Sequence, residues 1–266
     1  MLQNISQKAN KASSRGDNMK GLIRWWQHIG ARPTRVGWGL AQQGPAWSLV
    51  GLQRQSEQLV RVQTAQALQP NTAEAHPDKA WLSQALRQIG PAQDGSGKRL
   101  NLALGLVDLA LGRIEFPAQL DEADWVAEVQ LEAAQALGLE PDEVNFDFQP
   151  EETSPALVRR VQWVGCAKSH IADFKKCTRA AGWRLATVEP ELHAARRAAN
   201  ALQGGVPSLL TQPVLDWQFR LPGPHDGPHI KAAAGQAAGD AALLQAMASP
   251  VGARLVAAGL ALKAWS

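Results

Sequence analysis

The stretch NLALGLVDLALGRIEFPAQLDEADWVAEVQLEAAQALGLEPDEVNFD, residues 101–147, decides the fold. An apolar run, a turn and a second run that ends at Phe116-Pro117 predict two strands. Acidic residues crowd the first turn of an amphipathic segment that begins near Asp121, where negative charge favours a helix, and Gly138 is the predicted C-cap. A short connection leads to a third strand that carries Phe148. No residue in this stretch has the pattern of a catalytic group, so we expect a scaffold that holds a partner.

Three short apolar or alternating segments precede this stretch. They lie at residues 36–40, 47–53 and 58–65 and are separated by turn sequences, which predicts a three-stranded meander. Apolar residues at helical spacing predict a helix over residues 78–89. Residues 1–18 have the polar composition of a disordered tail.

After the central stretch the chain alternates strands and helices, which indicates a mixed α/β fold. A helix capped by Ser169 is predicted between the next two strands. Residues 204–230 are punctuated by Pro and Gly and predict loops around one short strand, whereas residues 231–250 are rich in Ala and Gly and predict no element. The remaining predicted elements are strands at residues 156–167, 183–188 and 215–220, and helices at residues 191–202 and 251–265.

Composition excludes several classes of protein. The chain has 266 residues, of which 45% are hydrophobic and 19% charged, so it is expected to be globular. A net charge of +3 is too small to indicate a nucleic-acid-binding protein. Cys166 and Cys177 are too few for a disulfide framework and are expected to be small buried residues. Residues 1–20 are polar and form no signal peptide, and no apolar run is long enough to span a bilayer, so we expect a cytoplasmic protein.

Two glycine-containing motifs are similar to nucleotide-binding motifs but lack required residues. Gly95-Ser96-Gly97-Lys98 resembles the end of a P-loop, but Ala92 replaces its first glycine and Arg99 replaces the Ser or Thr that binds magnesium. The segment 36–41 has two spaced glycines, but Gln42 stands where a dinucleotide-binding motif has a third, and a strand follows instead of a helix. Neither motif predicts a cofactor site.

No residue cluster predicts a metal or catalytic site. The loop residues His225, Asp226 and His229 could form a metal clip, but a structural zinc site usually has four ligands and no cysteine lies nearby. The sequence has no G-x-S-x-G motif. Five carboxylates lie close together in the chain, in a polar helix pattern that predicts a solvated face and not a catalytic pair: Asp121, Glu122, Asp124, Glu128 and Glu132.

Basic residues between the central stretch and residue 197 raise the alternative of a nucleic-acid contact. They are dispersed over one strand and two predicted helices and are nearly balanced by acidic residues elsewhere, so direct nucleic-acid binding is not expected. These residues are Arg159, Arg160, Lys168, Lys175, Lys176, Arg179, Arg196 and Arg197.

Several segments in order resemble the PilM family, the actin-like cytoplasmic proteins of type IV pilus assembly, and in particular its short HofM-type members. The acidic helix carries Glu132-Ala133 and is followed by Asp147-Phe148, which is similar to the family pattern. The likeness covers most of residues 35–203 and the last dozen residues. The segments that carry it are RVGWGLAQQGPAWSLVGLQRQ, RIEFP, DEADWVAEVQLEAAQALGLEPDEVNFDF, VQWVGCAKSHIADFKKCTRAAGWRLATVEPELHAARRA and VAAGLALKAW.

Departures from the family pattern bear on the implied fold and cofactor. The first strand pair of actin-like ATPases carries a phosphate loop with acidic and small hydroxyl residues, and here Gly39-Leu40-Ala41-Gln42-Gln43-Gly44 has neither. Between Gly204 and Val251 there are too few residues for a second lobe. The resemblance thus implies a partial actin-like (RNase H-like) first lobe with an inserted αβ subdomain, a largely absent second lobe and no ATP cofactor. The predicted units are a disordered tail at 1–18, part of the first actin-like subdomain at 19–100, the inserted subdomain at 101–188, and a remainder at 189–266 with a vestigial second lobe and a C-terminal helix.

The resemblance implies a non-catalytic scaffold of a type IV pilus or DNA-uptake platform, peripheral to the inner membrane. PilM-like proteins hold the cytoplasmic N-terminal peptide of the membrane protein PilN in a groove between two subdomains, through apolar anchors and added strand hydrogen bonds. Phe116, Trp125, Val129 and Phe148 are candidates for this groove or for the core beneath it. The alternative is an actin-like ATP-binding protein or ATPase with a degenerate site, which would need phosphate ligands such as the Gly95–Lys98 turn.

Overall fold

The computed structural model describes residues 36–44, 46–69, 79–89, 98–151, 158–221 and 236–265, with side chains described from residue 241 in the last segment. The predictions made for residues 1–18 and for His225, Asp226 and His229 lie outside these ranges, as do Gly95, Ser96 and Gly97 of the P-loop-like turn.

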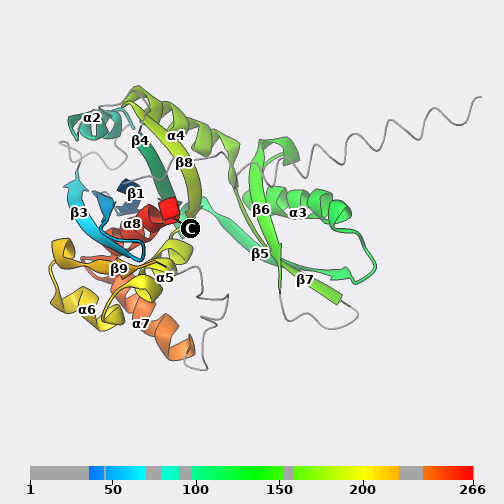
Figure 1. Cartoon of the computed structure of the whole chain (residues 1–266). Helices are drawn as coiled ribbons and strands as arrows, with labels where there is room; N and C mark the ends of the chain where they lie inside the picture. The colour runs from blue at the N-terminus through cyan, green and yellow to red at the C-terminus, as the bar shows by residue number, and fades with distance from the viewer. Residues whose placement is uncertain are drawn as a thin grey trace, which may run out of the picture.

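A six-stranded sheet forms the body of the molecule (Figure 1). Three consecutive strands pair antiparallel, which confirms the predicted meander. A later strand pairs in parallel with the first one, and another pairs in parallel with that later strand. A last short strand pairs antiparallel with the end of the meander. The strand order is β8-β4-β1-β2-β3-β9, with β1 (Val36–Gln43), β2 (Ala46–Arg54), β3 (Leu59–Leu68), β4 (Lys98–Leu104), β8 (Trp183–Pro190) and β9 (Gln218–Arg220).

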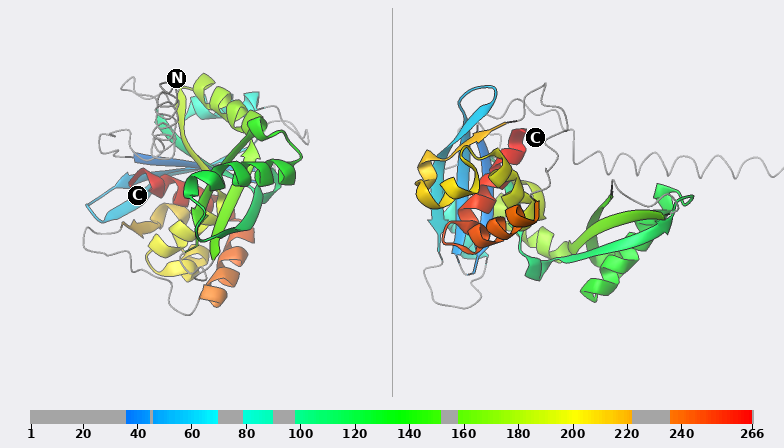
Figure 2. Two further views of the ribbon diagram at one scale, coloured as in Figure 1. Left: turned by 90° about the vertical axis from the view of Figure 1, so that its right-hand side faces the viewer. Right: turned by 90° about the horizontal axis from the view of Figure 1, so that it is seen from below.

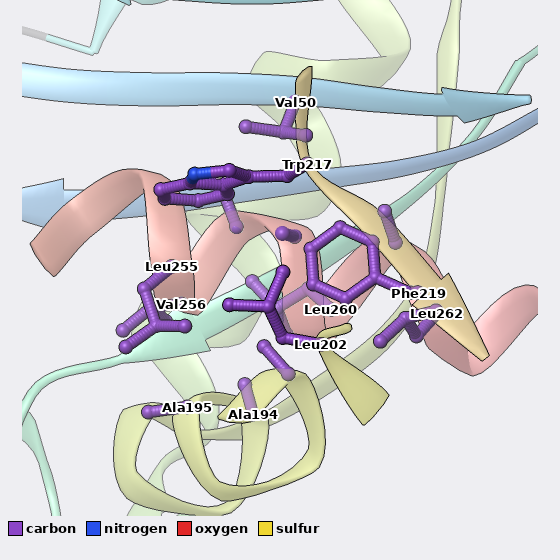
Figure 3. Close-up of a cluster of buried hydrophobic side chains, with 14 of the residues drawn as sticks. Val50, Ala194, Ala195, Leu202, Trp217, Phe219, Leu255, Val256, Leu260 and Leu262 are labelled. Atoms are coloured by element: carbon purple, nitrogen blue, oxygen red, sulfur yellow. The ribbon is translucent and has the colours of Figure 1, made fainter. Parts of the chain in front are cut away.

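Helices cover both faces of this sheet, so its strands bury alternate side chains in two separate cores. Leu40 and Leu49 lie in one core, whereas their neighbours Ala41 and Val50 lie in the other. The first core packs against α2 (Ala80–Gln88) and α4 (Lys168–Ala180). The second packs against α5 (Glu191–Ala201), α6 (Gly205–Thr211), α7 (Gln236–Ala248) and α8 (Gly252–Leu262), as the close-up in Figure 3 shows for part of the cluster.

Helix α8 lies closer to the sheet than ordinary side chains allow. A Cβ atom at Gly39 of β1 would overlap the backbone carbonyl oxygen of Ala257, and one at Gly37 would overlap that of Ala261. On the opposite side of α8, a Cβ atom at Gly259 would overlap the carbonyl oxygen of Ala194 in α5. The spaced glycines of β1 therefore admit a helix, and α8 is fixed between β1 and α5 by contacts that only glycine permits.

A second, three-stranded sheet is inserted between β4 and α4 and projects from the body as an arm (Figure 2). Its strands are β5 (Ala110–Pro117), β6 (Val144–Pro150) and β7 (Val158–Ala167), in the order β5-β7-β6, and α3 (Glu122–Leu137) packs on one face. Helix α3 begins directly after Asp121, near its predicted start, and its C-cap is Gly138, as predicted. Gly138 has a φ of 65°, the left-handed conformation that is common for a glycine C-cap. The boundaries 101–188 stay a prediction; the pairing of β4 with β8 places both strands in the body's sheet.

Most predicted elements are present, and the mixed α/β class is confirmed. An antiparallel meander extended by two parallel strands is compatible with the predicted partial actin-like lobe. Cys166 and Cys177 are both buried, as expected. Among the described residues no single helix is long and apolar enough to span a bilayer, and α7 and α8, which reach that composition only together, meet at an angle of 111°.

Three sequence predictions were wrong. Ser169 is not an N-cap, because α4 already begins at Lys168 directly after β7, and Ala167 is the cap residue. The loop expected after Gly204 contains α6, whose Pro207 lies in the first helical turn, where a missing backbone N–H does no harm. Residues 231–250, for which no element was expected, contain α7, because Leu243 and Ala246 are buried in the second core.

Candidate partner-binding site

Two chain connections join the arm to the body. Strand β4 leads through Gly105 and a short 3-10 turn, Leu106–Asp108, into β5, and β7 runs directly into α4. The Asp108 carboxylate lies 3.5 Å from Nδ1 of His170 in α4. The chain therefore crosses this junction twice, and the contact of Asp108 with His170 joins the first connection to α4.

Large apolar side chains are exposed at the first connection. Val107 is 96% exposed, Leu106 58% and Leu111 55%, although Leu109 between them packs against the core of the body. Five residues of chain reach at most about 18 Å, so Leu106 and Leu111 lie within that distance of each other. Large exposed apolar side chains that lie near one another often mark a site of contact with a partner.

The face of the arm's sheet opposite α3 is covered by no described element, and its apolar residues lie at the junction end. Leu111 pairs with Val164 near that end of the ladder. Farther out the same face is polar: Arg160 contacts Glu115 at 2.7 Å, and Arg113 contacts Glu151 at 2.6 Å. Strand β5 is also an edge strand, which leaves one side open to an added strand.

The structure brings together the four residues that the sequence suggested. The rings of Phe116 and Trp125 stack at 5.4 Å, and Trp125 meets Phe148 edge-on at 6.5 Å. Phe116, Trp125 and Val129 are buried and Phe148 is half-buried, in the core between α3 and the sheet. Their role in binding stays a prediction, and their position is that of the core beneath a surface.

A shallow pocket of about 510 Å³ lies beside this core, between β5 and α3. Ile114, Phe116 and Leu120 supply its apolar lining, and Glu128 and Glu132 of α3 stand at its rim. Neither glutamate has an ion-pair partner among the described residues. The acidic helix thus offers free carboxylates next to the open edge of β5.

The turn after β1, where an actin-like ATPase would bind phosphate, is occupied by its own contacts. The Gln43 side chain donates to the carbonyl oxygen of Ser249 at 3.1 Å and accepts from the backbone N–H of Ala253 at 3.3 Å, so it caps the start of α8. Lys98, the basic residue of the P-loop-like turn, lies 5.1 Å from the rings of both Trp38 and Trp183. Burial lowers the pKa of Lys98.

A buried ion cluster lies at the carboxyl end of β8. Glu189 accepts two hydrogen bonds from Arg197, at 2.6 and 2.8 Å, and one from Lys263 at 2.9 Å. Burial raises the pKa of the Glu189 carboxyl, but Arg197 and Lys263 outweigh it and hold the pKa below its ordinary value. Arg197 also donates to the carbonyl oxygen of Gly259, so this cluster fixes β8, α5 and α8. No group of three or more potential metal ligands occurs in the part of the chain that is described.

The basic residues weighed for nucleic-acid contact do not form one face. Arg197 and Arg160 are held by carboxylates in different sheets, and Lys168 donates to the carbonyl oxygen of Asp142. Only Lys175, Lys176 and Arg179 lie together, around a shallow hollow on α4.

Comparison with known proteins identifies a family whose sequence pattern matches this chain. Residues 47–215 match the family described as type IV pilus assembly protein PilM. These residues include the whole arm and most of the six-stranded sheet. No curated protein sequence matches the chain.

Solved structures with similar folds have low sequence identity. One, titled PilM-PilN type IV pilus biogenesis complex, is 17% identical with a TM-score of 0.48 over 64% of this chain and 53% of the other. The cytoplasmic domain of EpsL, an inner-membrane component of the type II secretion system of Vibrio cholerae, is 13% identical with a TM-score of 0.41 over 60% and 58%. A Bacteroides thetaiotaomicron protein of unknown function with an actin-like ATPase fold is 11% identical with a TM-score of 0.33 over 64% and 60%. The chain therefore spans less than two thirds of each of these solved chains.

Proposed function

This chain belongs to the family of type IV pilus assembly protein PilM, and from that membership we propose that it is a non-catalytic scaffold of a pilus assembly platform. In this role it binds the cytoplasmic N-terminal peptide of a PilN-like inner-membrane protein, and this contact holds the chain at the inner membrane. DNA uptake stays a prediction.

The observation that carries this proposal is the exposure of Val107, Leu106 and Leu111 at the junction of body and arm. A short peptide gains affinity from a few apolar anchors that lose water on binding, each fully buried side chain contributing about 1.5–3 kcal/mol. The open edge of β5 starts at the same place, so a bound segment can add backbone hydrogen bonds to the sheet.

Charge sets the direction in which such a peptide would lie. The free carboxylates of Glu128 and Glu132 stand near the outer half of β5, whereas the apolar residues stand at the junction. Cytoplasmic flanks of membrane helices are rich in Lys and Arg. We therefore place the apolar part of the peptide at the junction and its basic, membrane-proximal part along the acidic helix.

Calorimetric titration with the N-terminal peptide of the PilN-like protein tests the proposal. The variant V107D/L111D is expected to weaken binding at least tenfold, because it puts two charges where apolar anchors dock. The control L210D/L244D changes two other exposed leucines, on α6 and α7, and is expected to bind like the unaltered chain. Equal binding by both variants would remove the junction as the site, and absence of peptide binding by the unaltered chain would overturn the proposal. Micromolar binding of Mg-ATP in the same instrument would favour the ATPase alternative.

A further inference from the structure

We propose that the solvent face of α4 is a docking surface for an acidic phospholipid bilayer. The inner face of α4 is buried through Ile171, Phe174 and Cys177. Its outer face carries Lys175, Lys176 and Arg179, all exposed, around a shallow hollow lined by the methyl groups of Ala172 and Ala180. Docking of this face to a membrane is a second function, which does not depend on peptide binding at the junction.

These three cations have no carboxylate partner among the residues that the structure describes. The one acidic residue of α4, Asp173, is 3.6 Å from Lys79, whose ammonium group also lies 4.3 Å over the ring of Phe174. Positive charges at positions i and i+4 of a helix repel each other, so Lys175 and Arg179 are kept together at a cost that an anionic surface would remove.

Helix α2 extends the same positive layer. It contains no acidic residue, and Arg87 donates through Nε to the carbonyl oxygen of Ala180 at 2.9 Å. Ser83 of α2 donates to the carbonyl oxygen of Cys177 at 2.9 Å, so the two helices lie side by side (Figure 1). The layer is therefore built from two helices, and its positive charges come from flexible lysine and arginine side chains.

The shape of this layer favours a membrane over nucleic acid. A helix that reads duplex DNA must enter the major groove, which is about 12 Å wide. With α2 packed beside it, α4 does not protrude in that way. The small residues Ala172 and Ala180, which line the same hollow as the cations, instead allow close approach of a flat surface of phosphate groups. Cytoplasmic leaflets carry a negative surface potential that attracts such basic faces.

Flotation of the full chain with vesicles tests the proposal, with equal parts of phosphatidylglycerol and phosphatidylcholine compared with phosphatidylcholine alone. The unaltered chain is expected to bind only the anionic vesicles, and less so at high salt. The variant K175Q/R179Q is expected to lose about 25-fold in partitioning, from about fivefold for each basic residue. The control R61Q/R159Q removes the same charge from exposed residues of β3 and β7 and is expected to lose much less.

Equal losses in the two variants would overturn the proposal, because they would show an effect of net charge and not of this face. Absence of binding to anionic vesicles would overturn it as well. Binding to duplex DNA that K175Q/R179Q abolishes, with vesicle binding unchanged, would assign the face to nucleic acid instead. Circular dichroism of both variants checks that these exposed substitutions leave the fold intact.

Discussion

The body and the arm bury their sheets in different ways. In the body, both faces of the sheet are covered by helices, and α8 approaches β1 so closely that only glycine fits at Gly37 and Gly39. In the arm, α3 covers one face, and the other carries exposed ion pairs and the Leu111–Val164 pair. The body's sheet is therefore covered on both faces, whereas the arm's sheet has helix α3 on one face and β5 as an edge strand.

Charged groups follow the same division. In the body, the Glu189 carboxylate is buried and contacted by two cations. In the arm, Glu115 with Arg160 and Arg113 with Glu151 are ion pairs with exposed members, which contribute about 0–1 kcal/mol each. Substitutions in the buried core of the body should therefore act on folding, whereas substitutions of exposed residues on the arm should act on binding.

The largest effect is expected for Gly39→Val in the body. The new side chain would overlap the backbone of α8, which cannot move away without losing its contacts to α5, so the cost should exceed the about 3 kcal/mol of ordinary overpacking. We expect little soluble folded protein, measured by gel filtration and circular dichroism. Gly105→Ala is the control, because its Cβ would lie 3.8 Å from the nearest atom, a carboxylate oxygen of Glu191. A normally folded Gly39→Val protein would contradict the close packing of α8.

A smaller, local effect is expected for Trp125→Ala in the arm. It removes the stacked partner of Phe116 and should destabilise the arm by about 3 kcal/mol, while the body stays folded. Hydrogen exchange should then show faster exchange in β5 to β7 and unchanged protection in β1, β2 and β4. Trp125→Phe keeps an aromatic ring and removes an indole N–H that has no hydrogen-bond partner in the described part of the chain, so it should be milder. Simultaneous loss of protection in both sheets would show that the arm is not a separate unit.

The smallest effect is expected for Glu189→Gln, about 1–2 kcal/mol at neutral pH, because Arg197 and Lys263 still reach solvent. The folded pKa of Glu189 lies below its ordinary value of 4.5, so its contribution is complete above pH 4.5 and is lost as pH falls through the folded pKa. Urea unfolding of the unaltered chain and the variant should therefore converge in acid.

Glu191→Gln is the opposite control. Burial raises the pKa of Glu191, so its charged form opposes folding above pH 4.5, and the substitution should be neutral or stabilising there. Burial also lowers the pKa of His170 and His193, which reduces stability as pH falls below 6.5. The Glu189 carboxylate raises the pKa of His193, so this loss should be larger in Glu189→Gln than in the other two proteins. A constant difference between Glu189→Gln and the unaltered chain at every pH would contradict the ion cluster.

Local sequence patterns were sufficient for most elements of the fold. The alternation in β1 to β3 and the acidic start and glycine end of α3 each depend on residues a few positions apart. The patterns failed for two helices that depend on burial against distant residues. The residues of α7 show no amphipathic pattern, and Pro207 in α6 is typical of a loop. For the candidate site, the sequence identified the cluster of Phe116, Trp125, Val129 and Phe148 but not Leu106, Val107 and Leu111.

The sequence by itself determined most of the strands and helices and their order, because these follow from short-range periodicity and turn residues. Only the tertiary structure decided which apolar residues face solvent. Val107 and Leu109 are two residues apart in one apolar run, yet one is 96% exposed and the other packs against the core of the body. The tertiary structure likewise showed that Gln43 caps α8 although the two are 210 residues apart in the chain. It also showed that Lys175, Lys176 and Arg179 line one hollow on α4. Exposure and contacts of this kind depend on neighbours that are distant in the chain, which a local pattern does not record.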